Sequence, residues 1–333
     1  MSIQTEQPRH WREWELHHAV TPKSLVILFV VFILLSFSAH NTELDKAAVE
    51  TSKAVLSVVG VGESQVVDGA ARFVAKAFPI QISERTPVNR LTDFDRNDLP
   101  LFSYIESGEE KEYDALTDSW TVEKTEFLVQ PVGYLKKVVI KMWETIEMGF
   151  WGTVICIMIS LPLGILASKN YTPHRFVYSF TRVWLSFHRS LPELIVALIL
   201  VLMYGFGPIA GVLALAIHTS GVLGKFFADE IENAPPGPQL ALASSGANAF
   251  KVLRYAVFPH VYPAWIAYVQ YIFERNIRTA TVLGIVGAGG IGMELKGRWD
   301  VFDYDHVATI LLVIFTTVIL LEIISQKLRK NAL

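Results

Sequence analysis

The sequence predicts an all-α membrane protein with about six transmembrane helices and a hydrophilic insertion after the first of them. Hydrophobic residues make up 52% of the 333 residues and charged residues 18%, whereas soluble domains carry about 25% charged residues. The apolar residues also gather in several runs that approach the roughly 20 residues needed to cross a bilayer. Both observations indicate a multi-pass membrane protein.

Composition also excludes several classes of function. The formal net charge is -3, so no overall basic field points to a nucleic acid partner. The single cysteine, Cys156, lies inside an apolar run, which rules out an intramolecular disulfide or a metal site of the C-x-x-C type. We therefore expect no metal site and no catalytic residue in this chain.

The chain opens with a polar segment, 1–23, which we expect to be cytoplasmic. Its tryptophans, Trp11 and Trp14, suit a membrane interface. The first span follows at 24–40. Its end, Ser36–Ala39, could imitate a signal peptidase site, but the long leader carries several glutamates, which favours a retained span.

The segment 41–137 is the one large hydrophilic block, with more acidic than basic residues. Two pieces, Leu44–Val59 and Ser64–Phe78, have the periodicity of amphipathic helices. The acidic stretch Glu84–Glu126 is expected to form loops. The block is either a decorative insertion or a docking or gating surface for a partner.

The region 138–328 carries the remaining spans, and a cytoplasmic tail, 329–333, follows it. A helix from His174 is expected to lead into the third span, and a glycine-rich loop, Gly284–Tyr304, to precede the last. The short loops rich in lysine and arginine lie on the side of both termini, so that side is cytoplasmic, and the insertion is external. The expected spans two to six are Trp143–Ala167, Leu191–Phe206, Ile209–Ile231, Tyr262–Leu283 and His306–Ser325.

The glycine-rich loop contains a literal G-x-G-x-x-G match, Gly287, Gly289 and Gly292 with Gly290 between them. A dinucleotide site needs this pattern after a strand and before a helix of a βαβ unit, and here it follows a membrane span. We interpret it as a tight turn of small residues between helices. A functional alternative is a loop that seals the outer mouth of a pathway.

Ionisable residues at membrane depth usually face a bundle interior or a water-filled cavity. Arg189 and Glu193 flank Leu191-Pro192, where a helix break is expected, and Glu274 and Arg278 are spaced to pair on one helix. They are either structural charges near the membrane edge or part of a path in which both arginines meet an anion. His188 and His218 are expected to be packing or interface residues. The predicted path also includes Ser190, Asn276 and Thr281.

A moderately polar stretch, 238–258, lies between the fourth and fifth spans. Its apolar residues recur at threes and fours, which predicts one amphipathic helix at the membrane surface. Pro238 suits its first turn, and Pro259 and Pro263 are expected to end it.

This stretch resembles the cytoplasmic coupling motif of ABC importer permeases, Glu-Ala-Ala, three residues, Gly, nine residues, then Ile-x-Leu-Pro. Gly246 matches the glycine, Ala241 the first alanine and Ala256–Pro259 the ending. Leu240 stands where the glutamate is usual, so the grip on a partner would rest on shape and apolar contact. The residues that this resemblance assigns to the coupling surface are Leu240, Ala241, Ser245, Gly246, Ala247, Phe250 and Pro259.

Three further motifs resemble permeases of phosphonate importers and of the related phosphite and hypophosphite importers. They are Arg189–Glu193, Gly205–Gly211 and Asn276–Gly292. The similarity covers roughly Trp143–Ser325. Methionine importers carry a similar glycine loop, so methionine remains an alternative substrate.

The resemblance implies a type I ABC importer permease fold in the bacterial inner membrane. It implies a homodimer of this chain, two copies of an ATPase subunit that binds the ATP and Mg, and a periplasmic or lipid-anchored binding protein, with membrane lipid around the spans. The chain has no G-x-x-x-x-G-K-[ST] loop, so it is not expected to be an enzyme. Two rival classes are a membrane receptor, which should carry a cytoplasmic signalling domain, and an ion-coupled secondary transporter, which should show inverted repeats.

Overall fold

The computed structural model describes residues 22–58, 60, 62–91, 94, 96, 99–100, 102–114 and 119–332. Most of the predicted cytoplasmic segment 1–23 therefore lies outside the described residues. The chain forms two compact units, Met1–Ala75 and Lys76–Leu333, and each is described by itself.

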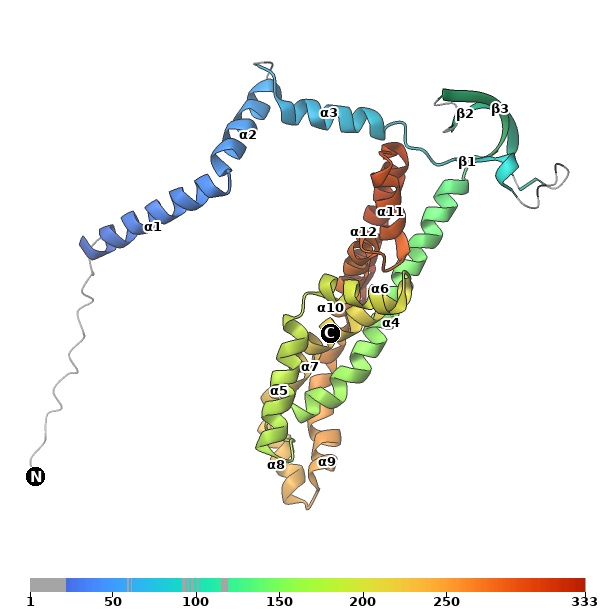
Figure 1. Ribbon diagram of the computed structural model, residues 1–333. Helices are drawn as coiled ribbons and strands as arrows, with labels where there is room; N and C mark the ends of the chain where they lie inside the picture. The colour runs from blue at the N-terminus through green and yellow to red at the C-terminus, as the bar shows by residue number, and fades with distance from the viewer. Residues whose placement is uncertain are drawn as a thin grey trace, which may run out of the picture. The chain divides into compact units, whose positions relative to one another are not determined.

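The first unit contains the helices α1 (Pro22–Asn41), α2 (Leu44–Val58) and most of α3 (Gln65–Ala77) (Figure 1). α1 is 20 residues long and apolar on all sides, as a membrane span is. The two amphipathic helices predicted for the start of the insertion are confirmed.

The second unit begins with a three-stranded antiparallel sheet in the order β1-β3-β2. The expectation of loops over Glu84–Glu126 is therefore wrong. The strand Ser119–Gln130 is rich in β-branched and aromatic residues, which suit a pleated surface, whereas the strand Tyr104–Asp114 consists mainly of charged residues, which concealed its strand character. The strands are β1 (Glu84–Pro87), β2 (Tyr104–Asp114) and β3 (Ser119–Gln130), with a short 3-10 turn, η1 (Val88–Arg90), after the first.

A bundle of helices makes up the rest of the second unit. The central pair is α4 (Gly133–Leu166) and α7 (Pro208–Asn233), and α10 (Phe258–Ile285) packs against both (Figure 1). The other members are α5 (Arg175–Ser190), α6 (Glu193–Tyr204), α8 (Pro236–Ser244), α9 (Ala249–Val252), the π-helical turn η2 (Leu253–Val257), α11 (Gly290–Asp300) and α12 (Tyr304–Ala332).

Small residues allow the central helices to approach closely, as is typical of membrane bundles. A Cβ on Gly164 of α4 would lie 2.8 Å from Phe227 Cβ of α7, and one on Gly149 would lie 2.6 Å from Ile277 of α10. The glycines that interrupt the apolar runs are therefore packing positions between helices.

By length and composition, four helices among the described residues could cross a membrane, and five if the pair α5 and α6 is one broken span. α10 has 28 residues, but it carries Glu274, Arg275 and Arg278, so the fifth span expected at Tyr262–Leu283 stays a prediction. The structure bears out the all-helical permease core, and the sheet is confined to the insertion.

Two local expectations are corrected. The predicted loop Gly284–Tyr304 contains α11, because side chains from α4 cap its first turn, a contact that local sequence does not reveal. The predicted single helix 238–258 is divided into α8, α9 and η2, and Pro259 and Pro263 do not end it. Pro259 occupies the first turn of α10, where a missing N–H costs little, and α10 continues past Pro263.

Candidate functional site

The break between α5 and α6 shapes the first candidate site. α5 ends at Ser190, Pro192 caps α6 without a side-chain bond, and the two helices meet at 85°. Proline disfavours helical backbone at the preceding residue, so Leu191 is extended. The break predicted at Leu191-Pro192 is confirmed, and it leaves backbone groups that must find partners within the bundle.

His218 of α7 supplies one of those partners. Its Nδ1 lies 2.7 Å from Leu191 O, and its Nε2 lies 3.1 Å from Nη2 of Arg275 on α10. A carbonyl oxygen can only accept a hydrogen bond, so Nδ1 carries the proton, and Nε2 accepts from the guanidinium. Glu193 Oε1 lies 3.5 Å from the same Nη2. The three side chains therefore tie α6, α7 and α10 together at the break.

An open groove lies beside this network. Arg278 lines it and pairs with Glu274 one turn away, at 2.8 Å, which confirms the predicted pair. Arg278 remains 44% exposed at its side chain, whereas Arg275 is more enclosed. The lining residues are Pro192, Glu193, Leu194, Arg278, Thr279, Val282 and Leu283.

The structure brings some of the predicted path residues to the groove and leaves others elsewhere. Arg189 and Ser190 lie on exposed positions of α5, and Thr281 Oγ1 bonds the Arg278 carbonyl. Asn276 is fully buried and donates to Thr153 Oγ1 of α4 at 2.9 Å. Asn276 therefore joins α10 to α4 away from the groove. Its Oδ1 has no hydrogen-bond partner among the described residues.

His218 and Arg275 were not predicted as site residues. Their partner Glu193 is far away in sequence, so spacing along the chain could not connect them. The one local signal was a histidine and an arginine within predicted membrane spans, where such residues are uncommon.

The glycine turn packs against the turn between α6 and α7. Gly207 N donates to Gly287 O at 3.1 Å, and Gly287, Gly289 and Gly290 all have positive φ, which favours glycine. Gly290 N donates to Glu144 Oε1, and Ile291 N donates to Thr145 Oγ1, at 3.0 and 2.8 Å. These two α4 side chains cap α11, a role for which their own stretch of sequence carries no local sign.

The surface predicted to couple to a partner is a helix–turn–helix. Gly246 has φ +85, and a Cβ added there would meet no atom within 4 Å, so the glycine is required by the turn and not by crowding. Leu240 and Phe250 are 65% and 67% exposed on either side of the turn. Asn248 caps α9 by accepting from Lys251 N at 3.0 Å.

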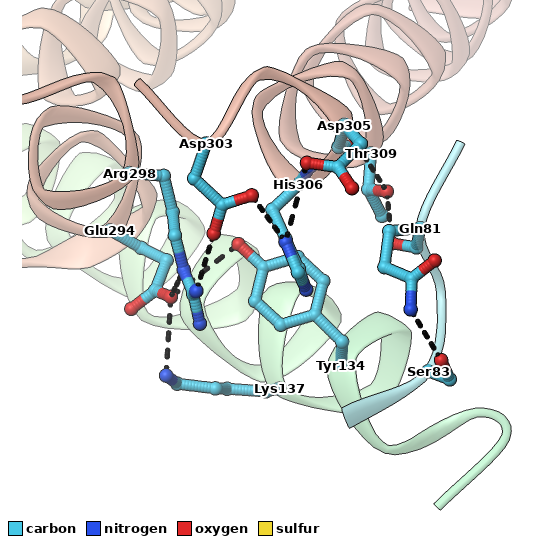
Figure 2. Close-up of polar contacts among 10 residues, drawn as sticks. All are labelled: Gln81, Ser83, Tyr134, Lys137, Glu294, Arg298, Asp303, Asp305, His306 and Thr309. Carbon is cyan, nitrogen blue, oxygen red and sulfur yellow. Dashed lines mark hydrogen bonds and ion pairs between the residues drawn. The ribbon is translucent and has the colours of Figure 1, made fainter. Parts of the chain in front are cut away.

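A polar network joins α4, α11 and α12 at the end where the sheet is attached (Figure 2). Glu294 accepts from Lys137 at 3.1 Å and from Arg298 at 3.3 Å, and Asp303 pairs with Arg298 and His306, both at 2.7 Å. Burial raises the pKa of Asp303, but hydrogen bonds from Asp305, His306 and Arg298 outweigh it and lower that pKa to about 2.

A short strap from the insertion, Pro79–Ser83, is bonded to the same end of the bundle. Thr309 Oγ1 of α12 donates to Gln81 O at 2.5 Å (Figure 2). Leu135 N of α4 donates to Ile82 O at 3.2 Å. The insertion is therefore attached to α12 as well as to the helix that follows it in sequence.

The fold and the helix–turn–helix at Gly246 define a polytopic transport permease. Residues 160–330 match the family described as "Binding-protein-dependent transport system inner membrane component", and the chain belongs to that family. It is 50% identical over 256 residues to the "Putative phosphite transport system permease protein HtxE" of Stutzerimonas stutzeri, an alignment covering 76% of this chain and 98% of the relative.

Two further comparisons agree. The chain is 44% identical over 188 residues to the phosphite transport system permease protein PtxC of Stutzerimonas stutzeri, covering 56% of this chain and 68% of the relative. A solved structure of the MetNI methionine ABC transporter in an inward-facing conformation superposes with a TM-score of 0.52 at 19% identity, over 59% of this chain and 96% of that chain. The similarity to the methionine transporter structure concerns the fold alone.

Proposed function

We propose that this chain is the permease of an ATP-driven importer for phosphite, hypophosphite or phosphonates in a bacterial inner membrane. The observation that carries the proposal is the 50% identity to a phosphite permease relative across nearly that relative's whole length. Relatives named for phosphite transport recur at 44% identity, whereas permeases named for D-methionine transport are 26% identical.

The chemistry of the groove agrees with an oxyanion as the cargo. Guanidinium groups bind phosphate-like oxyanions through parallel hydrogen bonds, and Arg278 presents such a group at the groove. Glu274 is the partner of this guanidinium, at 2.8 Å. An oxyanion that replaces Glu274 would meet the guanidinium beside the first turn of α6, whose N–H groups also favour negative charge.

The partners follow from the family and from the exposed turn at Gly246. Two ATPase subunits would hold the ATP and Mg, a binding protein would deliver the cargo from the outside, and two copies of this chain would enclose the path. The exposed apolar side chains of Leu240 and Phe250 offer the ATPase a contact that does not need the usual glutamate. Closure of the ATPases would press on this turn and switch access to the path.

The proposal is tested by uptake in cells that express this chain with its encoded ATPase and binding protein. We expect phosphite or methylphosphonate to accumulate only when this chain is present, and excess phosphonate, but not methionine, to compete. Arg278→Gln should reduce uptake at least tenfold, whereas Lys296→Gln, which removes an exposed charge paired with Asp300 on α11, should not. Methionine uptake, or accumulation without the chain, would refute the proposal.

The coupling surface has its own test. Gly246→Glu should abolish uptake and the co-purification of the ATPase while the protein stays in the membrane. Gly237→Ala, at a glycine on α8 with open space around it and no positive φ, is the matched control. Full uptake by the Gly246→Glu variant would count against this role of the turn.

A further inference from the structure

We infer that α3 is an interfacial helix that lies in the lipid headgroup region, on the side of the membrane where the insertion is attached, with its apolar face in the bilayer. The inference does not depend on the cargo of the permease. It rests on the face that α3 presents, on the two points where the segment that contains α3 is attached, and on the charges that lie off that face.

The larger apolar side chains of α3 lie on one face. Val66, Ala70, Phe73 and Val74 recur at spacings of three and four residues, which places them along one stripe, and the stripe ends at Ala77, which is buried within the protein. Val66 and Val74 are 54% and 53% exposed, and Phe73 is 37% exposed. A short helix of low overall hydrophobicity with such a stripe is typical of helices that lie in a membrane interface.

Both ends of the segment that contains α3 are held at one membrane surface. Its N-terminal end follows α1, a candidate span that ends at Asn41. No helix described between α1 and α4 is long and apolar enough to cross a membrane, so the end of α1 and the start of α4 lie on the same side. The C-terminal end leads within four residues to the strap, which is bonded to α4 and α12.

The strap meets α12 where that helix enters its candidate span. Gln81 N donates to Asp305 O at 3.4 Å, and Thr309 Oγ1 donates to Gln81 O. Lys76, in the last turn of α3, lies 5.8 Å from the ring centre of Tyr304, and tyrosine is enriched at membrane interfaces. α3 therefore ends at the level of the membrane surface.

The polar side of α3 fits lipid headgroups. Arg72 lies on the side of the helix opposite the apolar stripe and Lys76 lies at the edge of the stripe, and long basic side chains can keep their stems on apolar surface while the charges reach phosphates. A soluble partner would also cover an apolar stripe, but it would not explain why both ends of the segment are fixed at the bilayer. The attachment of the segment at the bilayer therefore makes lipid the partner of the apolar face.

The test uses the full chain in lipid nanodiscs, with spin labels on cysteines introduced along α3. Cys156→Ser supplies the background, because Cys156 is the chain's single cysteine. Labels at Val66, Ala70 and Val74 probe the stripe, and labels at Asp68 and Arg72 on the other face are the controls. We expect oxygen to relax the stripe labels severalfold more strongly than a water-soluble nickel chelate does, with the reverse at the controls.

Two outcomes would overturn the inference. Equal access of the nickel chelate to both faces would mean a solvated helix, and protection of the stripe from both reagents would mean a protein partner. A second variant guards against a label that disturbs the helix: Val66→Asp with Val74→Asp should expose a label at Ala70 to the nickel chelate. Unchanged relaxation in that variant would also contradict lipid contact.

Discussion

Replacing Gly292 by alanine tests whether the turn between α10 and α11 depends on close backbone packing. A Cβ on Gly292 would overlap Thr281 O and would lie 2.9 Å from Gly284 Cα. Both atoms belong to the main chain of α10, so they cannot move unless the helix itself moves. The substitution should therefore separate α11 from α10 or strain the turn that joins them.

The magnitude follows from two opposing terms. Overpacking a well-packed core costs about 1–3 kcal/mol, and contact with backbone places this site near about 3 kcal/mol. Alanine regains about 1 kcal/mol over glycine in a helix, which leaves a net loss of about 2 kcal/mol. A loss of that size should lower the midpoint of thermal unfolding by about 4–8 °C in a domain of this size.

Gly297 provides the matched control in the same helix. A Cβ there meets nothing within 4 Å, so the alanine variant keeps the gain in helix propensity alone and should raise the midpoint by about 2–4 °C. If the two glycine-to-alanine variants shift the unfolding midpoint in opposite directions, the effect of packing is separated from the effect of helix propensity.

The chain carries its own reporter for this measurement. Cys156 is the single cysteine and is fully buried, so a thiol-reactive fluorescent dye labels it only when the bundle opens. Unfolding of detergent-purified protein is followed by dye fluorescence during heating. If Gly292→Ala melts within about 1 °C of the parent protein, the close approach of α10 and α11 is wrong.

Three further predictions follow from other parts of the structure. Because Gly246 has positive φ with open space around it and asparagine tolerates that conformation better than valine, Gly246→Asn should keep most uptake and Gly246→Val should lose it; equal uptake would show that the turn does not need this conformation. Thr309→Val removes the hydroxyl that bonds Gln81 O and should lower stability by about 1 kcal/mol, whereas Thr309→Ser keeps the hydroxyl and should not. The dye assay compares the unfolding midpoints of the two variants. Equal midpoints would refute a stabilising bond between the strap and α12. Since the pKa of Asp303 is lowered to about 2 in the folded protein, ionised Asp303 contributes stability above its ordinary pKa of 3.8, and that contribution is lost as pH falls towards 2. Denaturation followed by tryptophan fluorescence should show this loss. Asp303→Asn should reduce the acid dependence to the part contributed by other carboxylates such as Glu294, whose pKa is also lowered, and an unchanged acid dependence would refute this role of Asp303.

Much of the helical core could be predicted from sequence because each long apolar run reports its own length and burial. The expected span Ile209–Ile231, for instance, differs little from α7. The break at Leu191-Pro192 was also predictable, since proline acts on its own backbone and its neighbour. These signals are local, so they survive without knowledge of the packing.

What could not be predicted depends on contacts between distant residues. α11 lies where a loop was expected, because Glu144 and Thr145 cap it from α4, 146 residues away in both contacts. In the insertion, β2 consists mainly of charged residues and forms a strand by pairing with β3. The helix expected over 238–258 is interrupted at Gly246 because this one residue has positive φ. The apolar periodicity continues on both sides of Gly246, so the sequence pattern does not show the interruption.

The charges at the break illustrate why residue type alone does not assign a role. Arg275 donates to His218 and pairs with Glu193, and His218 in turn bonds the carbonyl of Leu191 that the break leaves free. Removing Arg275 would therefore disturb the backbone of the break as well as the charge of the groove. Arg278 is held by Glu274 of its own helix and has no bond to the break among the described residues. Under the proposed function, an anion would replace Glu274 at Arg278 without disturbing the break, so we expect Arg278 to bind the cargo transiently and Arg275 to hold the shape of the path.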